Sequence, residues 1–150
     1  MPEQMTIKRA RRDKRQGKSP STQAGEFVRE EMHHIREGKH GARSSKQAIA
    51  IGLSKARRAG VKLRRPPASA KATTKRRARS ASQAGRGRTR RAAPKRSRAT
   101  KRALRREGHR AASRKALARQ ARSASRRRSV AARRASARRA ARTRQRRRAA

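Results

Sequence analysis

The chain has 150 residues, of which 51 are Lys or Arg and only 7 are Asp or Glu, so its formal net charge is +44 at pH 7. A compact fold does not require this excess, and the repulsion opposes compaction, which indicates that an abundant polyanion is the usual partner. The lack of cysteine excludes disulfides and thiolate zinc sites, and an apolar content with Phe27 as the single aromatic residue excludes a core that fills the whole chain.

Residues 1–20 are interpreted as a basic N-terminal arm. Residues 1–15 carry charges throughout and lack the apolar stretch of a signal peptide, while Glu3 and Asp13 are atypical of a mitochondrial presequence. No apolar run approaches the roughly 20 residues that a membrane span requires. We therefore expect a cytoplasmic protein that does not bind membranes.

Residues 21–63 are predicted to form a helical hairpin. The first helix is expected to run from about Thr22 to Arg36, with Ser21 as its N-cap and Gly38 just past its end. Glu31 is the one discordant position on its apolar stripe. That stripe consists of Ala24, Phe27, Val28, Met32 and Ile35.

The second helix of the hairpin has clear start and stop signals. Ser44 and Gln47 have the capping-box spacing, and Gly60 with Val61 suits a Schellman ending after a helix from about Ser45 to Ala59. Small residues on its apolar face would let another backbone approach, so we expect residues 22–36 of the same or a second chain to lie against Gly52. Self-association of the hairpin therefore stays open. The packing residues are expected to be Phe27, Val28, Met32, Ile35, Ile49, Gly52 and Leu53.

Residues 64–150 are interpreted as a low-complexity Arg/Ala/Ser tail, because Pro66-Pro67 cannot continue a helix and marks a natural boundary near residue 64. The tail contains 35 of the basic residues and one acid. Glycines and prolines up to about Pro94 favour coil, whereas Ala and Arg beyond Gly108 favour a helix once phosphates neutralise the charge. The expected fold class is therefore mainly α: a small two-helix module followed by a long basic Ala/Arg tail, disordered when free or helical when bound.

The density of charge in the tail matches that of nucleic acid. From Lys101 onward 21 of 50 residues are basic, so a helix would present a charge about every 3.6 Å, close to the roughly 3.4 Å between phosphates of one DNA strand. The residues expected to bind nucleic acid are Lys46, Arg57, Arg58, Arg86, Arg88, Arg90, Arg91, Arg126, Arg127, Arg128, Arg133, Arg134, Arg138, Arg139, Arg146, Arg147 and Arg148.

Two patterns suggest more specific contacts with DNA. Arg86-Gly87-Arg88-Thr89 is similar to the Arg-Gly-Arg-Pro core of an AT-hook, although Thr89 replaces the proline. On the second helix, Gln47, Ala50 and Ser54 share an outer face that would meet base edges in a major groove. Basic residues on the same helix favour phosphate contacts over base reading.

No pattern indicates catalysis or metal binding. His33, His34 and His40 lie near Glu30 and Glu37 in the sequence, but no strict ligand spacing supports a metal site. No acid–base–nucleophile set and no glycine-rich phosphate loop is present. We expect neither a cofactor nor a metal, and no enzymatic activity.

The segment SKQAIAIGLSKARRAG, residues 45–60, resembles the signature of a bacterial family of unknown function, and the preceding Lys39-His40-Gly41 fits the same pattern. The resemblance covers roughly residues 20–63. It implies a small basic protein with a variable Lys/Arg/Ala tail, and some members are described as DNA-binding; no catalytic or ligand residues are implied. The tail is similar in composition to those of bacterial histone H1-like proteins.

These observations favour a histone-like protein of the bacterial nucleoid that binds duplex DNA with little regard to sequence. The alternative is an RNA-binding, ribosome-associated basic protein. A single aromatic residue argues against base stacking on single strands. Membrane-surface binding lacks the bulky apolar face that it needs.

Overall fold

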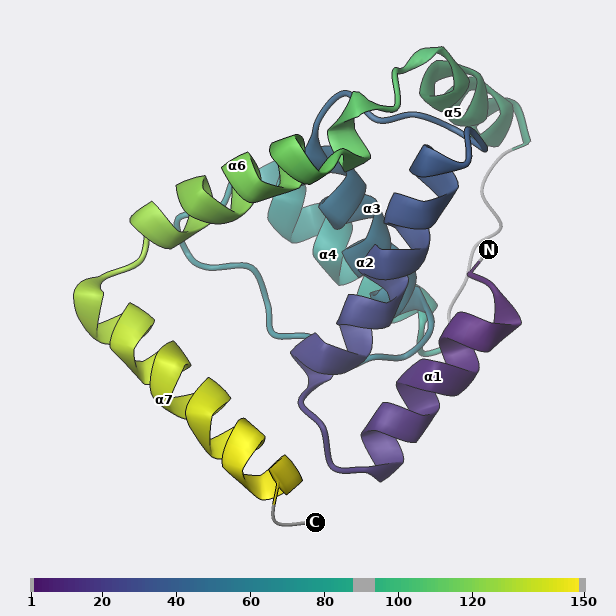
Figure 1. Cartoon of the computed structure of the whole chain (residues 1–150). Coiled ribbons are helices and arrows are strands. Elements are labelled where there is room, and N and C mark those ends of the chain that lie inside the picture. The colour runs from purple at the N-terminus through teal and green to yellow at the C-terminus, as the bar shows by residue number, and fades with distance from the viewer. Residues whose placement is uncertain (1, 88–93, 149–150) are drawn as a thin grey trace. The chain divides into compact units, whose positions relative to one another are not determined.

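The computed structural model describes residues 2–87 and 94–148, and the regular structure in these ranges is entirely helical (Figure 1). The chain divides into two compact units, an N-terminal unit (residues 1–113) and a C-terminal unit (residues 114–150). The helices of the N-terminal unit are α1 (Gln4–Arg15), α2 (Pro20–Arg36), α3 (Ser45–Arg58), α4 (Ala72–Ala84) and α5 (Pro94–Arg106), followed by a short 3-10 turn, η1 (Arg110–Ala112). Those of the C-terminal unit are α6 (Arg114–Arg126) and α7 (Val130–Arg148).

The mainly α fold class is confirmed, but the description as a two-helix module with a basic tail is wrong. The expected N-terminal arm contains α1, which packs against α2, and the stretch expected to be coil before Pro94 contains α4, which packs against α3. Gly85 marks the end of α4 rather than a region of coil, and its backbone lies against the carbonyl groups of Arg57 and Arg58. Tertiary packing, which local composition does not reveal, accounts for the difference.

The helix α2 begins two residues earlier than expected. Ser19, not Ser21, is the N-cap: its Oγ accepts the amide of Thr22 at 3.3 Å, and Pro20 occupies the first helical position. Proline is favoured there because the first turn leaves its amide groups unpaired in any case. The other end agrees with the expectation, since Gly38 adopts a left-handed φ of 75°.

Both ends of α3 are as predicted. Ser44 Oγ accepts the amide of Gln47 at 3.2 Å, although Gln47 Oε1 reaches back to the amide of Arg43 at 2.9 Å rather than to that of Ser44. Gly60 has a φ of 87°, and the amide of Val61 donates to the carbonyl of Ala56 at 3.0 Å. These bonds form the Schellman ending that the sequence indicates.

The helices α2 and α3 touch through backbone at Gly52. A Cβ at this position would lie 2.7 Å from Cα of Val28, closer than real side chains tolerate. Phe27, Met32 and Ile35 are buried, whereas Val28, Ile49 and Leu53 are only partly buried. The core also recruits Ala10 of α1 together with Ile7, Val61 and Leu63. The core of the hairpin is therefore completed by segments that precede α2 and follow α3 in the sequence.

The end of α5 and the η1 turn cover the loop between α2 and α3. The amide of Gly41 donates to the carbonyl of Leu104 at 2.8 Å, and that of Ala42 donates to Gly108 at 3.1 Å. Ser45 Oγ donates to the carbonyl of Ala111 at 2.6 Å. Residues 104–112, which the sequence assigns to the tail, thus belong to the N-terminal unit.

The C-terminal unit has no interior of its own. No described side chain of α6 or α7 is buried. Ser129 caps α7 by accepting the amide of Ala132 at 3.2 Å. Within the described ranges, no helix combines the length and the apolar character that crossing a bilayer would require.

Two glycine-to-alanine substitutions should have opposite effects on stability. Gly52→Ala should destabilise the N-terminal unit by about 1–3 kcal/mol, because its methyl group would meet the backbone of Val28. Gly25→Ala, a matched change in α2 with no atom within 4 Å of the new methyl group, should stabilise it by up to about 1 kcal/mol through helix propensity. Thermal melting of the full chain measures both. An unchanged or higher melting temperature for Gly52→Ala would contradict the close packing.

Truncation should show how far the N-terminal unit extends. A chain ending at Leu63 loses α4 and the hydrogen bonds from residues 104–112. We expect it to melt on the order of 10 °C or more below a chain ending at Ser113, since each lost hydrogen bond contributes about 0.5–1.5 kcal/mol. Equal melting temperatures for the two truncated chains would show that the docked segments contribute nothing.

Candidate nucleic-acid interface

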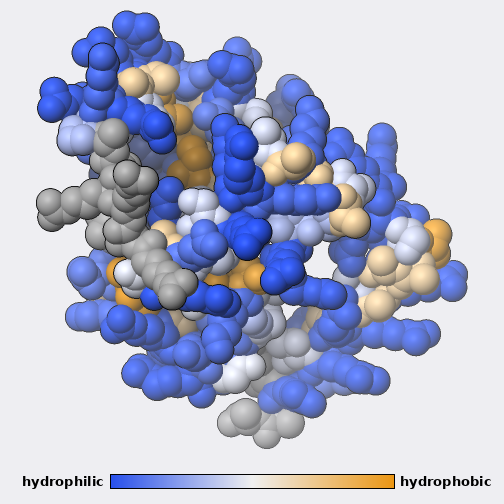
Figure 2. All heavy atoms as spheres, turned by 180° about the vertical axis from the view of Figure 1, so that it is seen from behind, coloured by the Kyte–Doolittle hydropathy of each residue, from blue (hydrophilic) through white to orange (hydrophobic). Residues whose placement is uncertain are grey.

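The basic residues of the C-terminal unit are not balanced by acids. Residues 114–150 contain 16 Lys or Arg and no Asp or Glu. Figure 2 shows hydrophilic side chains over most of one face of the molecule, with apolar side chains in small separate patches. The described arginines of α6 and α7 are exposed, so their guanidinium groups are accessible to phosphates. Arg139 and Arg144 also donate to Ser136 Oγ and to the carbonyl of Ala140, each at 3.4 Å.

Three arginines form a row on α6. Arg119, Arg122 and Arg126 are spaced by three and four residues, so they lie on one side of the helix. With Ser123 and Arg127 they line a shallow hollow of about 350 Å³. Four guanidinium groups around one hollow present many N–H donors, and no acidic side chain lines it, which suits phosphate oxygens.

The helix α7 carries charge on all sides. Arg127 and Arg128, which the sequence also predicts to bind nucleic acid, lie just before α7, in the segment that joins it to α6. The exposed arginines of α7 that the sequence predicts to bind nucleic acid are Arg133, Arg134, Arg138, Arg139, Arg146 and Arg148. The side chain of Arg147 lies outside the described residues, as do Arg88, Arg90 and Arg91 and hence part of the AT-hook-like segment. Arg86 is exposed.

The outer surface of α3 is less available than the sequence suggests. Lys46 and Arg58 are exposed, but Arg57 is partly buried and donates from Nη2 to the carbonyl of Arg64 at 3.3 Å. Burial lowers the pKa of the Arg57 guanidinium. Gln47 already uses Oε1 to accept the amide of Arg43. A glutamine reads adenine through both its oxygen and its nitrogen, so this capping bond weakens the case for base reading.

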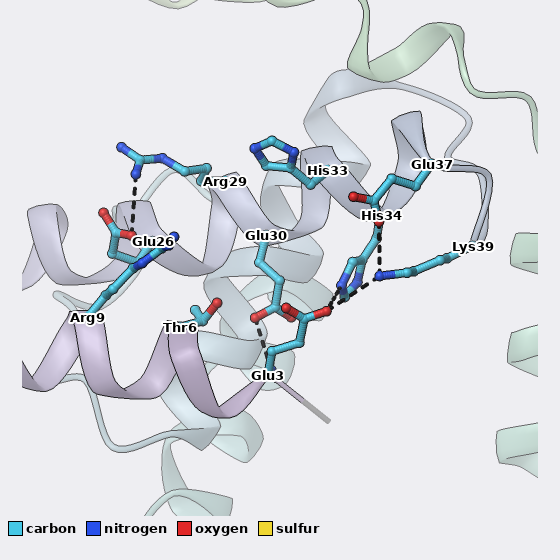
Figure 3. A pocket seen from close by; sticks show the side chains of 10 residues that line it. All are labelled: Glu3, Thr6, Arg9, Glu26, Arg29, Glu30, His33, His34, Glu37 and Lys39. Carbon is cyan, nitrogen blue, oxygen red and sulfur yellow. Dashed lines mark hydrogen bonds and ion pairs between the residues drawn. The ribbon is translucent and has the colours of Figure 1, made fainter.

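Four of the seven acidic side chains gather instead between α1 and α2. They surround a hollow of about 330 Å³ whose lining residues are Glu3, Thr6, Arg9, Glu26, Arg29, Glu30, His33, His34, Glu37 and Lys39 (Figure 3). Glu3 Oε1 lies 2.8 Å from His34 Nε2 and 3.5 Å from Lys39 Nζ, and Glu37 lies 2.9 Å from the same ammonium. Carboxylates line this surface, so it does not suit phosphate.

These contacts shift the pKa values of the acids. The hydrogen bond from His34 lowers the pKa of Glu3, and that from Lys39 lowers the pKa of Glu37 and raises that of Lys39 itself. Burial alone would raise the pKa of Glu30, but hydrogen bonds from Thr6, the Glu3 amide and Lys55 outweigh it, and the net direction is down. Glu3, Glu30 and Glu37 are therefore ionised at neutral pH and neutralise nearby cations.

Part of the chain is similar to a known sequence family. Residues 15–67 match the model of the "Family of unknown function (DUF6496)", which spans α2, α3 and the loop between them. No curated protein and no solved structure matches the chain. The matched segment is therefore similar to an uncharacterised domain family, and the C-terminal unit lies outside the match.

Removing the arginine row of α6 should weaken binding to a polyanion. Replacing Arg119, Arg122 and Arg126 by alanine should make the slope of log K against log salt shallower by about 2–3 for duplex DNA, since each lost phosphate contact contributes about 0.9. The matched control replaces three exposed arginines of α1 (Arg11, Arg12 and Arg15). Equal slopes for the two triple variants would contradict an interface centred on the C-terminal unit.

Proposed function

We propose that the protein is a sequence-tolerant DNA-binding protein of the bacterial nucleoid that acts, as histones do, by neutralising phosphates. The observation that carries the proposal is the C-terminal unit: 16 basic residues, no acid and no buried side chain among its described residues. Helices with this composition repel themselves and lack a core, so they gain most from a dense array of negative charge.

The spacing of the charges supports duplex nucleic acid as the partner. Residues 114–148 contain 16 basic residues in 35, which on helices corresponds to one charge about every 3.3 Å. Phosphates along one strand of duplex DNA are roughly 3.4 Å apart. This agreement requires no recognition of bases, and it favours backbone contacts over specific sites.

The N-terminal unit has a different part in the proposal. It contains all the buried residues of the described ranges, and its acids are paired with cations. We assign to it docking or self-association, with Lys46 and Arg58 as secondary phosphate contacts. The proposal assigns no reaction to either unit.

The salt dependence of binding tests the proposal. If the full chain contacts about ten phosphates, the log–log salt slope with duplex DNA should be near −9, and scrambled duplexes of equal length should bind with nearly the same affinity. A slope shallower than about −3, or a strong preference for one sequence, would contradict the proposal.

Competition with RNA distinguishes the alternative function. A structured RNA of equal length should compete no better than duplex DNA at the same ionic strength. If RNA competes at concentrations tenfold lower or less, the protein is an RNA-binding basic protein, as the ribosome-associated alternative requires.

A further inference from the structure

The carboxylate of Glu31 is buried, yet its oxygens lack well-formed hydrogen bonds to the described residues. Its side chain is completely buried at the middle of α2. Lys55 Nζ lies 2.7 Å from Oε2 as an ion pair, yet neither oxygen accepts a hydrogen bond of good geometry from the described residues. A buried carboxylate has lone pairs for about four partners, and leaving them unused is costly. Oε1 in particular lacks a donor.

Two imidazole rings lie beside this carboxylate. His40 Nε2 lies 3.3 Å from Glu31 Oε1, and its Nδ1 lies 3.1 Å from the carbonyl of Gly41. A carbonyl oxygen only accepts, so Nδ1 carries the proton, and in the neutral ring Nε2 has the free lone pair. A bare nitrogen lone pair facing a carboxylate oxygen is repulsive, so either a second proton on the His40 ring or a metal cation must lie between the two atoms.

The ring of His34 is held in the same way. Its Nε2 lies 2.8 Å from Oε1 of Glu3, which also accepts, so the other nitrogen of the neutral ring has the free lone pair. Metal-binding histidines almost always donate their second nitrogen to a carboxylate or a backbone carbonyl. His34 has such a partner in the carboxylate of Glu3, and His40 has one in the backbone carbonyl of Gly41.

The three side chains form a cluster of suitable size for one metal ion. One ligand atom each from Glu31, His34 and His40 lies within 4.8 Å of the others. Tetrahedral zinc with bonds of about 2.0–2.1 Å holds its ligand atoms about 3.3 Å apart. The Glu31–His40 pair already has this separation, so modest side-chain shifts would complete the site.

The local charge also favours a dication. Glu3, Glu30, Glu31 and Glu37 are offset here by Lys39 and Lys55. Glu26, Arg9 and Arg29 line the hollow between α1 and α2, so five carboxylates against four cationic groups leave one negative charge, although the whole chain carries +44. A divalent ion would offset this charge.

We propose that Glu31, His34 and His40 bind one Zn²⁺ ion, with a water molecule as the fourth ligand. The ion links α2 to the loop that precedes α3 and so fastens the hairpin. The unit has few large apolar residues and no cysteine, so a metal ion would add stability that its core and disulfides cannot supply. Glu31 and His34 are three residues apart on one helical face, the Glu-x-x-His arrangement of helical metal sites. The proposal is independent of DNA binding.

Titration of the full chain with zinc alone tests the site. In competition with a chromophoric chelator at pH 7.5, we expect one Zn²⁺ per chain, and at least tenfold weaker binding by the His40→Gln variant. His33→Gln is the matched control, because His33 is exposed and adjacent to His34 but outside the cluster. Equal affinities for the two variants, or no stoichiometric binding by the wild-type chain, would overturn the proposal.

Two further measurements do not depend on how a variant folds. Saturating Zn²⁺ should raise the melting temperature of the wild-type chain by about 5 °C or more, and a chelator should reverse the shift. Co²⁺ in place of Zn²⁺ should give the visible absorption of a four-coordinate site. No thermal shift, or the weak spectrum of hydrated Co²⁺, would refute the site. The salt slope for DNA should be the same for His40→Gln and the wild-type chain, so the outcome leaves the proposed function separately testable.

Discussion

Repulsion among 51 basic side chains is the constraint on which the rest of the structure depends. The chain has seven acids, and all of them lie in the N-terminal unit, where each has a basic partner within 3.6 Å. Exposed pairs contribute little individually, but Lys55 between the buried carboxylates of Glu30 and Glu31 neutralises charge in the interior. The C-terminal unit has no such compensation, and an external polyanion is the compensation that we propose.

Close backbone contacts at glycine are the second feature that holds the N-terminal unit together. With only one aromatic residue, the unit buries few large side chains, and it also brings helices and loops together at glycine. Gly52 admits Val28, Gly41 admits the carbonyl of Glu107, and Gly85 admits that of Arg57. These contacts recruit segments from well beyond the matched family region. The two units therefore differ in structure: the N-terminal unit has a packed core, and the C-terminal unit exposes its basic side chains.

The sequence predicted local features well and long-range ones poorly. The caps of α3 and the left-handed Gly38 could be predicted because they depend on a few adjacent residues. The docking of α4 and of residues 104–112 could not, because alanine-rich helices carry no apolar periodicity strong enough to reveal a partner. For the site, charge predicted the exposed arginines of α7, but not the partial burial of Arg57. Glu31 looked discordant in an apolar stripe, and only the fold shows His40 beside it.

The most direct test of the central claim compares the full chain with a chain that ends at Ser113. The truncated chain keeps every acid and loses 16 basic residues. Our account predicts that it retains cooperative thermal unfolding, while its log–log salt slope with one duplex DNA becomes shallower by at least 3 and its affinity at about 0.15 M salt falls by an order of magnitude or more. An unchanged slope and affinity would show that the C-terminal unit is not the nucleic-acid interface.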